Sequence, residues 1–128
     1  MTGKTLQRLL AACGLSVALW NVPAHAAGDA TAGQTFFKRV CAMCHSTVAG
    51  RNMIGPSLAG VVGRTSGTAA NYTYSHAMAD AHLVWTPENL DKYLTSPQAA
   101  VPGNKMPYPG IKDATDRANV VAYLATLK

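Results

Sequence analysis

The sequence predicts an all-α fold, and three observations support this prediction. Apolar residues recur at helical spacing in several segments of the 128-residue chain. No segment alternates apolar and polar residues with the period of two that is typical of a half-buried strand. Long stretches rich in Gly and Pro, which favour loops, separate the helical segments. We therefore expect helices that are joined by unusually long connections.

Residues 1–26 have the layout of a secretory signal peptide. Basic residues precede an apolar stretch at 9–20, and small residues form a cleavage site before residue 27. A membrane anchor is the alternative, but an apolar stretch of about 12 residues is shorter than the roughly 20 of a spanning helix. Lipoprotein cleavage before Cys13 is a further alternative, although Arg8 leaves little apolar sequence ahead of it. We expect cleavage, a single domain at 27–128, no stable membrane insertion, and export to the periplasm of a Gram-negative bacterium.

The expected mature part is poor in large apolar side chains. Residues 27–128 carry 9 Lys and Arg against 6 Asp and Glu, so their net charge is +3 rather than the +5 of the whole chain. Only 18 of these 102 residues are Leu, Ile, Val or Phe, and a chain below about 20% in these types is short of core material. The modest net charge argues against a disordered chain. We therefore expect a group other than the side chains to supply apolar volume to the core.

The first half of this part predicts one long helix followed by loops. Asp29 can cap a helix whose apolar positions Phe36, Phe37 and Val40 lead into Cys41. Residues 50–74 contain five Gly, which predicts a loop with at most a turn or two of helix. A short helix is expected at 75–81.

The second half predicts two longer helices around a stiff loop. Thr86, Pro87 and Glu88 supply an N-cap, a proline at the first helical position and an acid in the first turn, and Pro97 is expected to end this helix. Three Pro and two Gly make 102–110 irregular. The last helix begins near 113 or 115 and has a broad apolar face.

The chemistry of the chain is concentrated in residues 41–45, Cys-Ala-Met-Cys-His. Cys-x-x-Cys-His is the attachment motif of a c-type haem, in which two thiols bond to the porphyrin and the adjacent His binds iron. A thioredoxin-like thiol pair would need a βαβ setting, which is not visible. A zinc site would need further ligands, and 31 residues separate Cys44 from His76, the first histidine after His45.

A second axial ligand is expected from a methionine. Four are present in the mature part, at 43, 53, 78 and 106. Met43 and Met53 lie too close in sequence to His45, and Met78 is more typical of core packing. Met106 lies in the stiff Pro-rich loop, where a rigid backbone can hold a weak thioether ligand, and His/Met ligation suits a c-type haem.

The chain resembles class I cytochrome c over essentially the whole of 27–128. The resemblance rests on the haem motif, Gly55 to Leu58, Gly63 to Gly67, Val84-Trp85, Pro102 to Met106 and the terminal helix, which occur in the family's order. It implies a small fold of three main helices, with short ones and long loops wrapped around one covalently bound haem c and its iron. It also implies that Gly33 lets Tyr123 approach the first helix beside Phe37.

The resemblance implies a role for each residue of the pocket. Cys41 and Cys44 attach the haem, and His45 and Met106 bind its iron. The carbonyl of Pro56 holds the imidazole. Residues at the positions that hold or shield the propionates are Arg64, Tyr74 and Trp85. The hydroxyl of Tyr93 lies near the Met sulfur. Departures from the family's pattern are Asn104 where Thr is usual, Met78 where Asn is frequent and Tyr108 for Phe, so polar contacts at the buried haem edge are expected to differ.

These features predict an electron-transfer protein rather than an enzyme. Six-coordinate iron has no position for a substrate, and no nucleophile or general base stands out. The expected partners are a quinol:cytochrome c oxidoreductase or a dehydrogenase as donor and a terminal oxidase or a similar acceptor. An alternative is a peroxidase-like enzyme or gas sensor in which Met106 dissociates.

The partners are expected to dock at the exposed haem edge of a monomer. A weak basic rim there would steer acidic proteins, and scattered solvated charges are the alternative. The residues of this predicted rim are Lys38, Arg39, Arg51, Lys105 and Lys112. No basic run or basic helical stripe indicates nucleic-acid binding.

Overall fold

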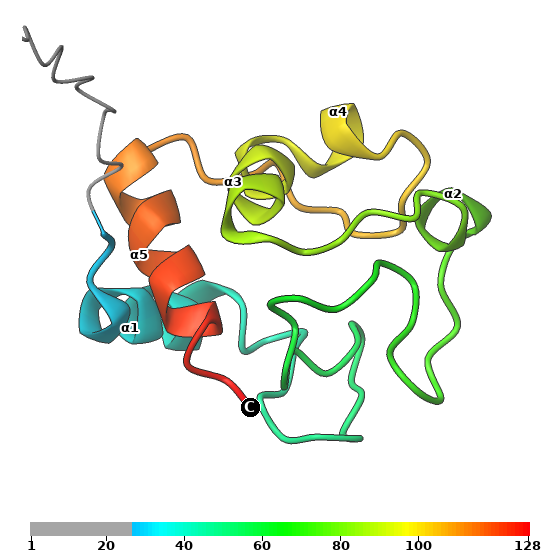
Figure 1. The fold of residues 1–128 in the computed structure, drawn as a ribbon, viewed down its shortest axis with the longest axis horizontal. Coiled ribbons are helices and arrows are strands. Elements are labelled where there is room, and N and C mark those ends of the chain that lie inside the picture. Colours follow the sequence, from blue (N-terminus) through cyan, green and yellow to red (C-terminus); the bar gives the residue numbers. More distant parts are fainter. Residues whose placement is uncertain (1–26) are drawn as a thin grey trace, which may run out of the picture.

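The computed structural model describes residues 27–128, so the predicted signal peptide at 1–26, Cys13 included, lies outside the described residues. Within the described part the regular structure is helical, and the only β-type pairing is an isolated bridge between Thr65 and Val84 (Figure 1). None of these helices has the length and apolar character needed to cross a membrane. The prediction of an all-α fold is confirmed.

Two of the three main helices begin at the predicted caps, and the third begins where the sequence predicted, between 113 and 115. The three helices are α1 (Ala30–Val40), α3 (Pro87–Thr95) and α5 (Ala114–Leu124). The Asp29 carboxylate accepts hydrogen bonds from two backbone N–H groups of α1, at 2.8 and 3.2 Å. Thr86 and Asp113 each accept one, at 3.1 and 2.9 Å. A side-chain oxygen at the N-cap satisfies N–H groups that the first helical turn leaves unpaired, so these helix starts are determined locally.

The two short helices differ from the sequence predictions. Helix α2 (His76–Ala79) is shorter than the predicted 75–81, because the chain turns through His82, whose φ of 49° lies in the left-handed region. Helix α3 ends at Thr95, before Pro97. Pro97 was expected only to end that helix, but it is also the first residue of α4 (Pro97–Ala100). Proline is tolerated at this position since its missing N–H has no helical partner there.

Helices α1 and α5 cross in close contact, which Figure 1 shows at the left of the molecule. A Cβ added to Gly33 would lie 2.9 Å from the Tyr123 Cβ and closer still to the Asn119 backbone. The Phe37 and Tyr123 rings pack with centroids 5.3 Å apart. The backbone N–H of Asp29 donates to Asn119 Oδ1 at 2.7 Å. The predicted contact of Gly33 and Phe37 with Tyr123 is confirmed, and it requires a residue without a side chain at position 33.

The buried apolar residues come from all three main helices and from the long loops. The core consists of Phe37, Val61, Met78, Trp85, Leu90, Tyr93, Val101, Ile111, Val120, Val121, Tyr123 and Leu124. In Figure 1 the segment after α1 runs through the lower part of the molecule, and the 101–112 loop returns past α3 to the start of α5. The loops therefore form part of the wall of the molecule's interior.

Candidate haem-binding site

A cavity of about 500 Å³ lies among these core residues. Its wall is largely apolar and includes side chains from α1, α3, α5 and both long loops. Such a volume falls within the range of small-molecule and cofactor sites. The structure brings all ten predicted site residues to this wall: Cys41, Cys44, His45, Pro56, Arg64, Tyr74, Trp85, Tyr93, Asn104 and Met106.

The two cysteines lie where α1 ends. The Cys41 N–H donates to Phe37 O at 2.8 Å, and the N–H groups of Cys44 and His45 both donate to Cys41 O at 3.0 Å. This tight turn gathers two thiols and one imidazole on the wall of the cavity. Burial, with the neighbouring Cys44 as a smaller cause, raises the pKa of the free Cys41 thiol to about 11. Redox-active thiols have a lowered pKa, so this environment does not suit a thioredoxin-like pair.

The His45 ring is fixed from both sides. Its Nδ1 lies 2.8 Å from Pro56 O, and a carbonyl can only accept, so Nδ1 carries the proton and Nε2 is free to bind a metal. Burial lowers the pKa of His45, which favours the neutral, metal-binding imidazole. On the other side is Gly55, where a Cβ would lie 2.7 and 2.8 Å from the two ring nitrogens. The ring therefore has a single orientation.

Met106 differs from the other methionines in its contacts. The Tyr93 hydroxyl lies 3.9 Å from Met106 Sδ and can donate to it, and burial raises the pKa of Tyr93 to about 12, so this hydroxyl keeps its proton. Met43 and Met53 are 71% and 42% exposed, in keeping with their predicted exclusion as ligands. Met78 is buried and also lines the cavity, as a core residue would.

Arg64 places an unpaired donor at the cavity. Its two terminal nitrogens donate to Ala59 O and Ser57 O, each at 3.0 Å. Within residues 27–128, its Nε is the buried side-chain nitrogen or oxygen that lacks a hydrogen-bond partner. The backbone N–H of Trp85 donates to Arg64 O at 2.9 Å, which holds these two residues together. An unpaired buried donor of this kind is costly unless a ligand supplies its acceptor.

Two other predicted pocket residues use their polar atoms in loop contacts. The Tyr74 hydroxyl accepts from Ala69 N at 3.2 Å, and its own proton has no acceptor among the hydrogen bonds of the described residues. The Asn104 side chain bonds to backbone groups of Pro97 and Val101, at the two ends of α4, and of Met106 in its own loop, rather than pointing a free polar group into the cavity. We expected Asn104 to alter polar contacts at the buried haem edge. In the structure its polar atoms instead contact the protein backbone.

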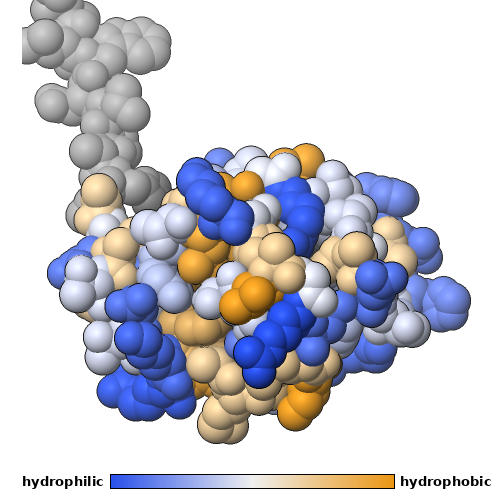
Figure 2. All heavy atoms as spheres, turned by 90° about the horizontal axis from the view of Figure 1, so that it is seen from below, coloured by the Kyte–Doolittle hydropathy of each residue, from blue (hydrophilic) through white to orange (hydrophobic). Residues whose placement is uncertain are grey.

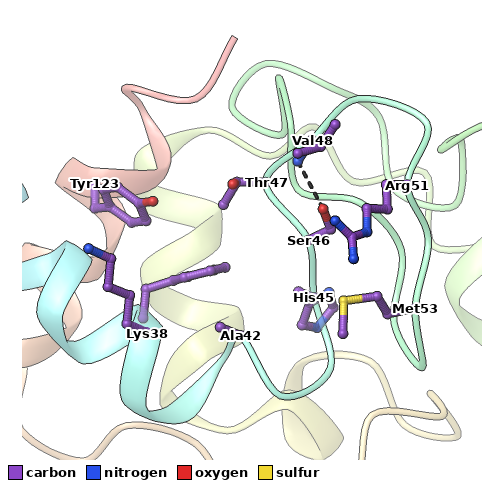
Figure 3. Close-up of a pocket in the computed structure, with 10 residues that line it drawn as sticks. Lys38, Ala42, His45, Ser46, Thr47, Val48, Arg51, Met53 and Tyr123 are labelled. Carbon is purple, nitrogen blue, oxygen red and sulfur yellow. Dashed lines mark hydrogen bonds between the residues drawn. The ribbon is translucent and has the colours of Figure 1, made fainter.

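The predicted basic rim is divided between two hollows. Arg39 and Lys105 line the large cavity, whereas Lys38 and Arg51 line a second, open hollow of about 350 Å³. Figure 3 shows this second hollow, with His45 and Met53 side by side on its wall. Lys112 lines neither hollow, because its Nζ donates to Thr95 O and Pro109 O at 2.8 and 2.9 Å. The five residues do not form one continuous rim.

Sequence reasoning gave no role to two residues that support the site. In the sequence Gly55 stands out only as part of a loop motif. That the His45 ring occupies the space of a side chain at position 55 follows only from the folded structure. Gln98 donates to Asn104 O at 3.0 Å and to Met106 O at 3.3 Å. No sequence signal indicated Gln98, because α4 itself was not predicted.

The residues of the cavity fit a c-type haem. Two thiols beside a neutral imidazole can attach the porphyrin and bind its iron, and a thioether sulfur lies on the same apolar wall. Arg39, Arg64 and Lys105 line the cavity, and among residues 27–128 no Asp or Glu does, which suits the carboxylates of a haem. The shortage of large apolar side chains is matched by a cavity in the core that an apolar porphyrin would fill.

Comparison with known proteins agrees with this geometry. The family model of cytochrome c matches residues 30–128. Cytochrome c2 of Rhodopila globiformis is 50% identical over 101 residues, covering 79% of this chain and 95% of that protein. Cytochrome c of Euglena viridis is 48% identical over 101 residues, covering 79% and 99%.

A solved structure has the same small helical fold. Cytochrome cH from Methylobacterium extorquens superposes with a TM-score of 0.73 at 40% identity, covering 77% of this chain and 99% of the other. The predicted class I fold and haem c cofactor are thereby confirmed. The chain belongs to the cytochrome c family, whose members carry one covalently attached haem c with its iron and transfer electrons rather than act as enzymes.

Proposed function

We propose that this chain is a soluble, exported one-electron carrier whose haem iron has His45 and Met106 as its two axial ligands. Its donor is a quinol:cytochrome c oxidoreductase or a periplasmic dehydrogenase, and its acceptor is a terminal oxidase or a similar electron acceptor. The observation that carries the proposal is that one apolar cavity joins the two thiols, the His45 imidazole and the Met106 sulfur. The family membership supports the electron-transfer class.

Each residue of the cavity has a part in holding the cofactor. Haem c, when bound, supplies an iron ion that gains and loses one electron. Cys41 and Cys44 hold it through thioether bonds, His45 offers Nε2, and Met106 offers Sδ. Two protein ligands leave no position for a substrate, and a rigid ligand set keeps the geometry change small during transfer. The unpaired Arg64 Nε is the proposed partner of a propionate carboxylate.

Export to the periplasm depends on residues 1–26, which we propose to be a cleaved signal peptide. The mature protein would then begin at Ala27. Mass spectrometry of the exported protein should give the mass of residues 27–128 plus one haem. A mass that includes Cys13 or a lipid would contradict the proposed cleavage.

The proposed docking surface is the part of the cavity rim that solvent reaches. Met43 and Ile54 line the cavity and are 71% and 75% exposed, and Arg39 and Lys105 line the same cavity. Figure 2 shows apolar groups standing among hydrophilic ones on the face of the molecule seen from below. Exposed apolar groups flanked by cations suit a brief encounter with an acidic partner.

Arg39→Glu is expected to slow electron transfer to an acidic partner several-fold at low ionic strength. Salt screens charges separated by more than about 8 Å at 0.15 M, so the difference should shrink as salt is added. Stopped-flow kinetics measures both effects. Lys128→Glu makes the same charge change outside both hollows and is the control. Equal slowing by both variants would mean that only net charge matters.

Met106→Ala is expected to remove the weak absorption band near the red edge of the visible spectrum that iron–sulfur ligation gives to the ferric protein. The reason is that alanine has no atom that can bind iron. Met78→Leu is the matched control, because Met78 also lines the cavity but should pack without binding iron. A band that survives Met106→Ala and disappears with Met78→Leu would transfer the ligand role to Met78.

The rate of carbon monoxide binding distinguishes an electron carrier with two protein ligands on the iron from an enzyme or a sensor with an open position. The reduced wild-type protein should bind it slowly at neutral pH, since both axial positions are filled, whereas Met106→Ala should bind it rapidly. Rapid binding by the wild type would contradict the proposed carrier.

A further inference from the structure

We propose that Asn104 is the positioning residue for the Met106 ligand, and that it couples the short helix α4 to the axial sulfur. The inference rests on the proposed role of Met106. It assigns a function to a side chain that lines the cavity yet turns its polar atoms toward the loop.

Asn104 makes three hydrogen bonds from a buried position. Only 8% of the surface of Asn104 is exposed to solvent. The Nδ2 group donates to Pro97 O and to Val101 O, both at 2.9 Å, and Oδ1 accepts from the backbone N–H of Met106 at 2.8 Å. The bonds to Pro97 and Val101 reach the first residue and the C-cap of α4.

The orientation of this amide is fixed by its partners. Two of them are carbonyls, which only accept, and one is an N–H group, which only donates. A flipped amide would set its oxygen against two carbonyl oxygens and its nitrogen against an N–H. The amide can therefore make all three bonds in one orientation only, and in that orientation Asn104 links α4 to Met106.

Gln98 adds a second link from the same helix. Its Nε2 donates to Asn104 O at 3.0 Å and to Met106 O at 3.3 Å. The Met106 backbone is thus held at its N–H by Asn104 and at its carbonyl by Gln98. Because a thioether is a weak ligand, its occupancy of the iron depends on how firmly the loop holds it.

Another asparagine provides a matched control. Asn52 Nδ2 donates to Ala70 O and Asn71 O at 2.9 and 3.0 Å, and its Oδ1 accepts from Ser57 N at 2.9 Å. It therefore makes the same three kinds of bond in a different loop, and it does not line the cavity. Removing either side chain deletes an equivalent set of hydrogen bonds. The Asn104 set holds Met106, whereas the Asn52 set holds the Pro56–Ser57 peptide group, whose carbonyl contacts His45, so Asn52 is a control for the Met106 side of the cavity.

The experiment compares Asn104→Ala and Asn52→Ala in the haem-loaded protein. Asn104→Ala is expected to raise the rate of carbon monoxide binding to the reduced protein at least tenfold and to weaken the red absorption band of the ferric protein. It should also speed hydrogen exchange at the Met106 amide. Asn52→Ala is expected to lower the thermal midpoint without changing the carbon monoxide rate by more than about twofold. Asn104→Thr keeps an oxygen that can accept from the Met106 N–H and is expected to lie between alanine and the wild type.

The outcomes separate the inference from the function on which it rests. If the wild type has no red band, Met106 is not the ligand and the proposed function fails first. If the band is present but Asn104→Ala and Asn52→Ala have equal effects, the carrier stands and the positioning role is overturned. If Asn104→Ala does not fold, Asn104→Thr and Gln98→Ala test the positioning role in its place. If both variants bind carbon monoxide at the same rate as the wild type, the positioning role is overturned.

Discussion

Without haem, the chain is expected to lose its cooperative unfolding transition. The cavity of about 500 Å³ has a largely apolar wall, and without haem this wall would be exposed to water instead of being buried against the porphyrin. A typical domain is stable by only about 5 to 15 kcal/mol, so losing this burial removes a large part of the stabilisation. Few large side chains are present to collapse into the space, so the folded state should not persist.

The double substitution Cys41→Ser and Cys44→Ser produces the haem-free chain, because neither hydroxyl can form the thioether bond. Circular dichroism during heating should show a sharp transition for the haem-loaded protein and a shallow, non-cooperative slope for the haem-free one. The competing expectation is that the packing of Phe37 against Tyr123 between α1 and α5 holds a core without haem. A sharp transition with a near-ultraviolet signal in the haem-free chain would support that expectation and contradict ours.

Gly55→Ala is expected to displace the His45 ring and to cost about 3 kcal/mol of unfolding free energy, at the upper end of overpacking effects. The new methyl group would lie 2.7 Å from Nδ1 and 2.8 Å from Nε2. Neither the Gly55 backbone nor the His45 ring can move easily. The Gly55 backbone donates to Cys44 O at 2.8 Å and accepts from Met53 N at 2.9 Å, and the ring is bonded to Pro56 O.

Gly50→Ala is the control for this substitution. Position 50 has a φ of 73° and open space around it, so alanine should cost only about 1 kcal/mol of backbone strain. Denaturant unfolding measures both variants, and the visible spectrum reports the state of the axial imidazole. Equal destabilisation, together with an unchanged spectrum, would mean that the space at Gly55 is not reserved for the ring.

The positions of the basic residues in the sequence did not predict which of them share a surface. The five basic residues of the predicted rim were grouped because they lie near the haem motif or the Met loop in sequence. The structure places Arg39 and Lys105 at the large cavity and Lys38 and Arg51 at another hollow, although Lys38 and Arg39 are neighbours in α1. Consecutive residues of a helix point in different directions, so proximity in sequence does not determine a shared surface.

The elements that the sequence determined by itself depend on neighbours a few residues away. Asp29, Thr86 and Asp113 cap helices through N–H groups two or three residues on, and the Cys-x-x-Cys-His motif closes within one turn. These interactions form whatever the rest of the chain does. For this reason the helix starts and the haem motif were readable without a structure.

Tertiary structure alone decided which distant groups support that motif. The space at Gly55, the unpaired nitrogen of Arg64 and the links from Asn104 and Gln98 to Met106 each require elements whose relative position no local pattern records. Helix α4 was missed because a proline ends one helix and begins another with equal ease, and the extended backbone of Ser96 separates the two. Short-range hydrogen bonds therefore determined the elements of this protein, whereas packing around the cavity determined how they hold the ligands.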